Sequence, residues 1–265
     1  MSKTKVVING ILGKMGQEVL NTICSEPNLV PTGGSDYTAQ QGELSLPDNS
    51  GKIPVSSSLE SLSGFENSDI VVDFTNASGA LSAIRMCCSS GKSIVVGSTG
   101  MTEKDIDEVK ILAGKSKSGI FIAPNFAIGM AVMMHLTKVA SRFFKYADLT
   151  EIHHEAKIDA PSGTAIAIAQ AAASGRSDDF DSNIPEKQTI AGTRGGLHQG
   201  INIHSARMPG RVAHHEIVFG ELGQTLSIRH DSINRQSFMP GVVMAINHVT
   251  KNPGLTIGLE NILGL

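Results

Sequence analysis

One run of the chain, EIHHEAKIDAPSGTA at residues 151–165, gathers side chains that can transfer protons and bind anions. Its first part reads as the end of a strand, where His153, His154 and Lys157 supply proton donors. Its second part opens a helix, with Ser162 in the N-cap position. Proton donors next to a helix start indicate a site that binds a negatively charged ligand and protonates it.

The start of this helix suits a carboxylate. The first N–H groups of a helix have no partner within the helix, and the helix dipole makes that end positive. Gly163 leaves room for a ligand, Ser162 and Thr164 add hydroxyl groups, and Lys157 adds a charge. Reduction of an unsaturated acid needs this pairing, because hydride delivery to one atom leaves negative charge that a general acid must neutralise on its neighbour. A polar strand end followed by a routine helix cap remains the alternative for this segment.

The histidines do not form a metal-binding pattern. Neighbouring residues on a strand point to opposite faces, so His153 and His154 are not expected to share an ion, and the same holds for His214 and His215. The segment contains neither a HExxH motif nor a cysteine. We therefore expect no metal site.

The glycine-rich turn GILGKMG near the N-terminus predicts a dinucleotide site. Gly10, Gly13 and Gly16 lie between a predicted strand and a predicted helix, in a GxxGxxG spacing rather than the usual GxGxxG. Glycines let the backbone approach a pyrophosphate, whose charge then rests on the helix N-terminus. Asp36, 20 residues after Gly16 and at the end of the next predicted strand, can accept hydrogen bonds from ribose hydroxyls. Plain turn glycines are the alternative.

Asp36 also favours NADH over NADPH. A 2′-phosphate would face its carboxylate, and residues 37–41 contain no Arg or Lys to neutralise the phosphate. A second glycine-bearing strand end, residues 97–100, is expected at the same sheet edge and near the nicotinamide half of the cofactor. On spacing alone, a plain strand-to-helix turn fits this stretch equally well.

The first half of the chain alternates apolar strand-like runs with amphipathic helical runs. This order predicts a Rossmann-like, doubly wound parallel sheet with right-handed crossovers. The predicted strands are residues 5–9, 29–35, 69–74, 93–97 and 120–123, and the predicted helices are 17–25, 79–90 and one that begins at Thr102 with a capping box to Asp105.

The second half has a different pattern, which predicts an α+β domain with an open mixed or antiparallel sheet. We expect helices at 130–144, 164–173 and 239–250, a strand at 147–154, an exposed loop at 174–187, and strands at 201–206, 211–219 and 224–230 with spacings that suit hairpins.

Length, composition and net charge limit the class of protein to which the chain can belong. A chain of 265 residues suits two modest domains, and 40% hydrophobic with 18% charged residues is typical of a globular protein. A net charge of -3 without any Lys/Arg run makes nucleic acid an unexpected partner. The chain contains neither an export signal nor 18 consecutive apolar residues, so we expect a cytoplasmic protein without a membrane span. Three scattered cysteines fit that reducing compartment.

The pattern E-x-H-H-x-x-K-x-D-A-P-S-G-T-A at 151–165 closely resembles the signature of the dihydrodipicolinate reductase (4-hydroxy-tetrahydrodipicolinate reductase) family, which serves the diaminopimelate route to lysine. The resemblance covers nearly the whole chain. Further motifs that resemble the family are Gly10 to Gly16, Asp73-Phe74-Thr75, Gly97 to Gly100, Ala123 to Phe126, Gly195, Ile203 to Arg207, Pro209-Gly210 and His215 to Phe219.

The resemblance implies a reductase that transfers hydride from a nicotinamide nucleotide to the cyclic product of dihydrodipicolinate synthase, a small dicarboxylate, to give tetrahydrodipicolinate. By motif position, His153 is implied as the catalytic acid/base and Lys157 as a proton donor. His154 is implied to contact the substrate, and residues 162–164 (Ser162, Gly163, Thr164) to hold one of its carboxylates. The implied cofactor contacts are Gly10, Ile11, Leu12, Gly13, Lys14, Met15, Asp36, Gly97, Ser98, Thr99, Ala123, Pro124, Asn125 and Phe126.

The resemblance also implies a homotetramer built through the substrate domains. Its last segment is implied to return to the nucleotide domain, which gives residues 1–125 with 236–265 as the dinucleotide-binding domain and 126–235 as the substrate-binding and oligomerisation domain. Two departures favour NADH, with NADPH still possible: Tyr37 stands where many members carry a basic residue, and Asn76 stands where some have Arg.

Two other readings stay open on the residues alone. Another Rossmann-type dehydrogenase, acting on a semialdehyde, needs a positioned cysteine nucleophile, whereas Cys24, Cys87 and Cys88 fall on predicted helices. A non-catalytic NAD(H)-sensing module does not need the His-His-Lys set beside an anion site.

Overall fold

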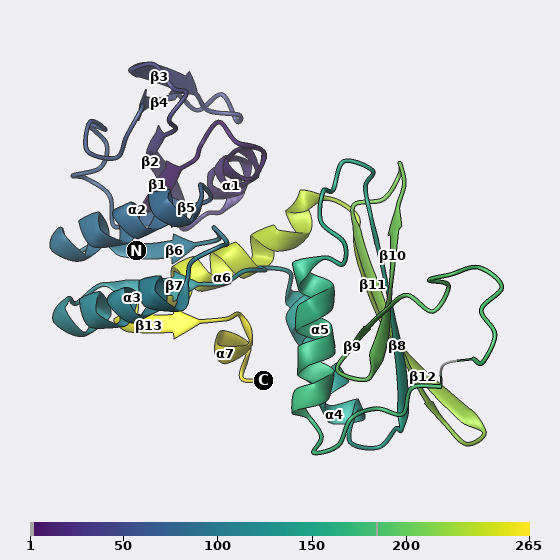
Figure 1. Cartoon of the computed structure of the whole chain (residues 1–265). Coiled ribbons are helices and arrows are strands. Elements are labelled where there is room, and N and C mark those ends of the chain that lie inside the picture. Colours follow the sequence, from purple (N-terminus) through teal and green to yellow (C-terminus); the bar gives the residue numbers. More distant parts are fainter. Residues whose placement is uncertain (1–2, 184) are drawn as a thin grey trace. The chain divides into compact units, whose positions relative to one another are not determined.

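A computed structural model of the chain describes residues 3–183 and 185–265. Residues 1, 2 and 184, which fall in the predicted first domain and the predicted loop, lie outside this described part. The chain divides into two compact units (Figure 1), one that runs to Ala127 and resumes at Phe238–Gly264, and one formed by Ile128–Ser237. None of the described helices is both long and apolar enough to cross a membrane.

The first unit contains an eight-stranded sheet within its described residues. The strands are β1 (Thr4–Asn9), β2 (Leu29–Ser35), β3 (Gly42–Ser45), β4 (Lys52–Ser56), β5 (Ile70–Asp73), β6 (Ser93–Val96), β7 (Gly119–Ile122) and β13 (Gly254–Ile257). Their order is β13-β7-β6-β5-β1-β2-β4-β3, and the described pairs are parallel apart from β3 with β4. The predicted Rossmann-like sheet is therefore confirmed.

Helices cover both faces of this sheet. They are α1 (Lys14–Ser25), α2 (Ala77–Ser89), α3 (Glu103–Lys115), α6 (Met239–Val249) and the short α7 (Glu260–Leu263). Helix α1 packs beside α6 and α2 beside α3, on opposite faces (Figure 1). The central strands are apolar without alternation because both of their sides are buried, as the 0% exposure of Val6, Val7 and Ile8 shows.

Three strands of this sheet are not apparent in the sequence. β3, β4 and β13 have four or five residues, contain Gly or Pro, and lie at or near the two edges of the sheet. Short edge strands keep part of their backbone free for solvent, so they tolerate residues that weaken the usual strand pattern.

The second unit has a five-stranded mixed sheet within its described residues, as expected. Its elements are α4 (Ile128–Ala140), β8 (Tyr146–His153), α5 (Gly163–Ser174), β9 (Gly196–His198), β10 (Ile201–Arg207), β11 (Ala213–Glu221) and β12 (Gln224–Ser232), followed by the 3-10 helix η1 (Arg235–Phe238) that leads back to the first unit. The strand order is β12-β11-β8-β10-β9, with β8 parallel to β10 and antiparallel to β11.

Two predictions for this unit are corrected. β10 and β11 do not form a hairpin, because β8 lies between them; only β11 and β12 form the expected hairpin. The helix expected to reach Phe144 ends at Ala140, since the chain then turns into β8. The polar loop after α5 is largely exposed, but its Phe180 is buried against Phe219 at a ring separation of 6.1 Å.

Strand β8 alternates strictly between the two faces of its sheet. Ala147, Leu149, Glu151 and His153 are buried on the face that α5 covers. A glutamate and a histidine thus occupy positions that the alternation assigns to the core.

Candidate active site

The glycine turn of the first unit is built as a close backbone approach. Gly10 has φ +85°, a conformation that glycine adopts without strain. A β-carbon on Gly16 would lie 2.1 Å from the carbonyl oxygen of Gly10, so the first turn of α1 rests directly on the strand end. Gly13 is the N-cap residue of α1 and, because glycine has no side chain, no side-chain hydrogen bond caps this helix start. The backbone amides at this helix start therefore suit an anion such as a pyrophosphate.

Asp36 lies at the carboxyl end of β2, next to this turn. Its Oδ2 accepts from the amide of Leu12 at 3.2 Å, and its Oδ1 accepts from the amide and hydroxyl of Thr38 at 3.0 and 2.7 Å. These bonds fix the carboxylate beside the glycine turn, as ribose recognition requires.

A pocket of about 500 Å³ opens between these residues and the end of β5. It includes Gly10, Gly13, Asp36, Thr75 and Asn76 in its lining. Strands β1 and β5 are neighbours in the sheet. After β1 the chain adds β2 on one side, and after β5 it adds β6 and β7 on the other side. Ligands of such sheets bind where the strand order reverses in this way. The pocket and the glycine turn together fit the adenosine and pyrophosphate part of a dinucleotide.

The remaining predicted cofactor residues lie along the same edge of the sheet, after β1, β6 and β7. Gly97, Ser98 and Thr99 follow β6, Ala123, Pro124, Asn125 and Phe126 follow β7, and Lys14 and Met15 begin α1. The side chain of Ile11 is fully buried, so only its backbone is available to a ligand. Leu12 and Thr99 are exposed.

Ser98 belongs to a buried polar network at this edge. Its hydroxyl donates to Oδ1 of Asp73 at 2.6 Å, and the side-chain amide of Asn9 donates to Oδ2 of Asp73 at 2.6 Å. Burial raises the pKa of Asp73, and the hydrogen bonds from Ser98, Thr75 and Asn9 counteract it only in part. The network links the carboxyl ends of β1, β5 and β6, where several of the predicted cofactor residues lie.

In the second unit, His153 is the last residue of β8 and is buried. Its Nδ1 forms a hydrogen bond with Glu151, which has no exposed surface. The buried glutamate also makes a two-pronged pair with Arg207 of β10, at 2.8 and 3.0 Å. Burial alone would raise the pKa of Glu151, but the hydrogen bonds from Arg207 and His153 outweigh it and hold that pKa below its ordinary value. The carboxylate is therefore ionised and accepts the Nδ1 proton of His153.

Ser162 is the N-cap of α5, as predicted from the sequence. Its hydroxyl accepts from the amide of Ala165 at 3.1 Å and lies 3.2 Å from Nε2 of His215 on β11. Burial lowers the pKa of His215 to about 3, so this imidazole is neutral. Gly163 and Thr164 follow as the first helical residues, and a β-carbon on Gly163 would meet no atom within 4 Å. The start of α5 is thus open to a ligand.

Lys157 lies in the loop between β8 and α5. Its amine pairs with Asp159 at 2.6 Å, and its positive charge is one of the causes that lower the pKa of His153, after burial as the largest. His154 directly follows β8 and is partly exposed. The structure therefore brings His153, Lys157 and Ser162 together around one loop.

Sequence reasoning missed Glu151, Arg207 and His215 as members of this site. Glu151 carried a signal, because an acid stood at an inward position of an alternating strand. Arg207 and His215 lie on other strands, 56 and 64 residues along the chain from Glu151. Both fall in motifs that resemble the family, but no local pattern indicates that they contact Glu151 and Ser162.

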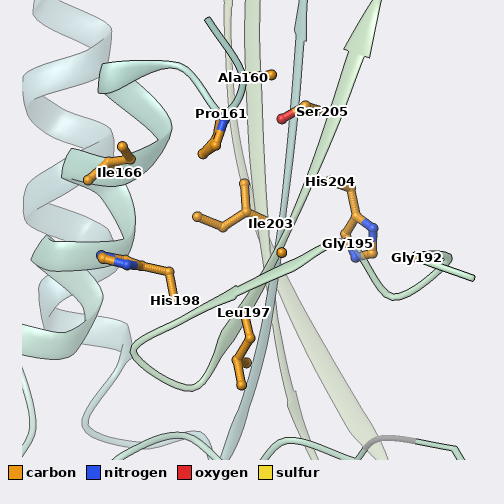
Figure 2. Close-up of a pocket in the computed structure, with 11 residues that line it drawn as sticks. Ala160, Pro161, Ile166, Gly192, Gly195, Leu197, His198, Ile203, His204 and Ser205 are labelled. Carbon is orange, nitrogen blue, oxygen red and sulfur yellow. The ribbon is translucent and has the colours of Figure 1, made fainter.

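A second pocket, of about 640 Å³, lies between α5 and the β9–β10 edge of the same unit (Figure 2). Pro161, Ile166, Leu197 and Ile203 line it, and His204 lies beside the glycines at its other end. Its lining contains neither His153 nor Lys157. The proton-donor cluster, and not this pocket, defines the candidate active site.

Neither an activated thiol nor a cluster of metal-ligating side chains is found among the described residues. Burial raises the pKa of the unpaired thiols of Cys24, Cys87 and Cys88, so none is activated as a nucleophile. Within the described part of the chain, no group of three or more His, Cys, Asp or Glu side chains is placed to hold a metal ion.

Fold and site together define a two-domain oxidoreductase of the Rossmann type. Residues 4–126 match the family described as dihydrodipicolinate reductase, N-terminus, and residues 129–263 match the family described as dihydrodipicolinate reductase, C-terminus. The chain belongs to the dihydrodipicolinate reductase family.

Individual relatives agree with this assignment. The chain is 45% identical to a 4-hydroxy-tetrahydrodipicolinate reductase of Dehalococcoides mccartyi over 265 residues, which covers 100% of both chains. It is 40% identical to one of Desulfitobacterium hafniense, over 99% of this chain and 100% of the relative. Among solved structures, a dipicolinate-bound dihydrodipicolinate reductase from Paenisporosarcina sp. TG-14 matches with a TM-score of 0.86 and 39% identity, over 98% of this chain and 99% of that one.

Proposed function

We propose that this protein reduces 4-hydroxy-tetrahydrodipicolinate to tetrahydrodipicolinate with a nicotinamide nucleotide, in the diaminopimelate route to lysine. The observation that carries the proposal is the arrangement of His153 and Lys157 beside the open, Ser162-capped start of α5. A cyclic dicarboxylate offers an anion for the helix start and an unsaturated bond for reduction and protonation. The names of the relatives support the same substrate.

Each residue of the cluster has a role in this reaction. The amides of Gly163 and Thr164 and the Ser162 hydroxyl hold one substrate carboxylate, and His154 contacts the substrate from the strand end. When bound, the nicotinamide nucleotide would supply the hydride, and the 4-hydroxyl group of the substrate must leave as water for the reaction to balance. Lys157 then delivers a proton to the atom on which negative charge develops, and His153 acts as the acid/base next to it.

We further propose that the enzyme prefers NADH, through the residues along the carboxyl edge of the first unit's sheet. Asp36 repels a 2′-phosphate, and the neighbouring Tyr37 is 91% exposed and brings no charge. The fixed carboxylate and the glycine turn support this cofactor site. The enzyme acts in the cytoplasm, where unpaired thiols persist.

NADH preference predicts a specific response to one added charge. With substrate generated by the synthase, the absorbance of NADH should fall faster than that of NADPH at equal concentrations. Tyr37→Lys should raise kcat/KM for NADPH by about fivefold, because an exposed ammonium close to a phosphate contributes on the order of 1 kcal/mol. Tyr37→Gln is the neutral control and should not change the ratio. A wild-type preference for NADPH would overturn the interpretation of Asp36, and a lack of turnover with either nucleotide would overturn the function.

We also propose a homotetramer assembled through the sheet of the second unit. Helices α4 and α5 pack on one face of this sheet, whereas Ile152 and Val218 on the other face keep part of their surface exposed between charged residues such as Glu216 and Arg229. A sheet face without covering helices is available for another copy. Light scattering should give four times the 27.9 kDa chain mass, and a monomer at micromolar concentration would contradict the assembly.

A further inference from the structure

Glu151 accepts hydrogen bonds from four donor groups, which belong to three residues of the second unit. Its Oε2 accepts from Nδ1 of His153 and from one guanidinium nitrogen of Arg207 at 3.0 Å. Its Oε1 accepts from the other guanidinium nitrogen at 2.8 Å and from the amide of Ser162 at 3.3 Å. One carboxylate therefore joins the proton-transferring histidine to the first residue of the carboxylate-binding helix start.

Arg207 ties the same carboxylate to the loop that carries Lys157. Its guanidinium donates to the carbonyl oxygen of Asp159 at 2.6 Å and to that of Ala206 at 2.7 Å, besides its two bonds to Glu151. The loop, the strand β10 and the buried carboxylate are thus fixed by one planar group. Arginine suits this position because its fork of donors matches a carboxylate in two places.

The bond to Glu151 determines which nitrogen of His153 carries the proton. An ionised carboxylate only accepts, so Nδ1 of His153 must donate, and Nε2 is left as the nitrogen that gains or loses a proton. A glutamine at 151 has one accepting oxygen and a donating amide, so it cannot satisfy all four donors.

We propose that Glu151, held in place by Arg207, is a positioning residue for the reaction: it fixes the tautomer and orientation of His153 and aligns it with the Ser162 helix start. This inference rests on the proposed function. Glu151 itself does not touch the substrate, because its surface is entirely covered by the protein.

The charges around His153 predict the direction in which each substitution shifts the pKa of this histidine. Burial is the largest cause that lowers the pKa of His153, Glu151 opposes it, and Lys157 and Arg207 lower it further. His215, whose ring centre lies 5.2 Å from that of His153, is uncharged. Loss of the Glu151 charge should therefore lower the pKa of His153, whereas loss of the Arg207 charge should raise it. If protonated His153 is the acid, activity falls as pH rises through the pKa of His153. That fall should begin at lower pH when the Glu151 charge is lost and at higher pH when the Arg207 charge is lost.

The test compares Glu151→Gln and Arg207→Met with the wild type. Glu151→Gln should lower kcat by roughly 10- to 100-fold, as loss of a carboxylate partner of a functional histidine commonly does, with NADH affinity unchanged because the cofactor residues lie in the other unit. Nitrogen NMR of His153 in the free protein should show one tautomer in the wild type and a mixture in Glu151→Gln. The pH profiles of the two variants should shift in opposite directions.

A matched control is Glu108→Gln, which breaks another two-pronged Arg–Glu pair, at 2.6 and 2.8 Å to Arg85, on exposed surface of the first unit. It should leave kcat and the His153 titration unchanged. If Glu151→Gln does not fold, the combined Glu151→Gln/Arg207→Met variant, which buries no unpaired charge, should still show the mixed tautomer.

Two results separate this inference from the proposed function. Absence of turnover in the wild type would contradict the proposed function. The NMR titration needs no substrate and would still test the role of Glu151. An unchanged His153 tautomer and an unchanged pH profile in Glu151→Gln, beside an active wild type, would remove the role of Glu151 alone.

Discussion

Lys157→Ala is expected to lower kcat by roughly 10²- to 10⁴-fold, the range that a positioned general acid contributes. The physical reason is that negative charge on the substrate is no longer neutralised by a proton from the Lys157 amine. NADH affinity should stay within twofold of the wild type, because the glycine turn and Asp36 belong to the other unit. Kinetics with saturating substrate would measure kcat, and NADH fluorescence would measure binding.

Two further variants separate the effect of the Lys157 amine on kcat from the effects of neighbouring charges. Asp159→Asn removes the partner of Lys157 but keeps the amine; since the Asp159 side chain is 51% exposed, a change in kcat of less than about fivefold is expected for a solvent-screened pair. Lys187→Ala removes an exposed lysine from a loop of the same unit and should have no effect. Wild-type kcat in Lys157→Ala would exclude this residue as the proton donor.

Gly16→Ala is expected to raise the NADH dissociation constant by up to about 100-fold and to destabilise the protein by roughly 1–3 kcal/mol, the usual cost of overpacking. The new methyl group would lie 2.1 Å from the carbonyl oxygen of Gly10 and 2.8 Å from the Cα of Ile11. Both neighbours are backbone atoms, so relief requires the glycine turn to move away from its position beside Asp36. Titration calorimetry with NADH and thermal unfolding would measure the two effects.

Gly114→Ala is the matched control for this substitution. Gly114 also lies in a helix, α3, but a β-carbon there would meet no atom within 4 Å. Alanine in a helix is favoured over glycine by about 0.5–1 kcal/mol, so this variant should be slightly more stable and bind NADH normally. Equal behaviour of the two alanine variants would show that the close approach at Gly16 does not matter.

Local signals predicted much of the fold. The helix starts at Thr102 and Ser162 were predicted because a capping side chain bonds to an amide three residues away, and both caps are present. The central strands β1, β5 and β6 were predicted because strands buried on both faces are continuously apolar. The edge strands β3 and β13 were missed because sheet pairing, and not their own composition, makes them strands.

The sequence by itself determined the family, the glycine turn with Asp36, and the proton donors around the Ser162 cap, because each of these depends on neighbours within one short segment or one motif. Only the tertiary structure decided that Glu151 is buried against Arg207 and that His215 reaches Ser162. These contacts depend on β8 lying between β10 and β11, and on a register that pairs Arg207 with His153 and His215 with Glu151. Strand order and register follow from the packing of a whole sheet, so residues more than 50 positions apart become partners without any local pattern that predicts the contact between them.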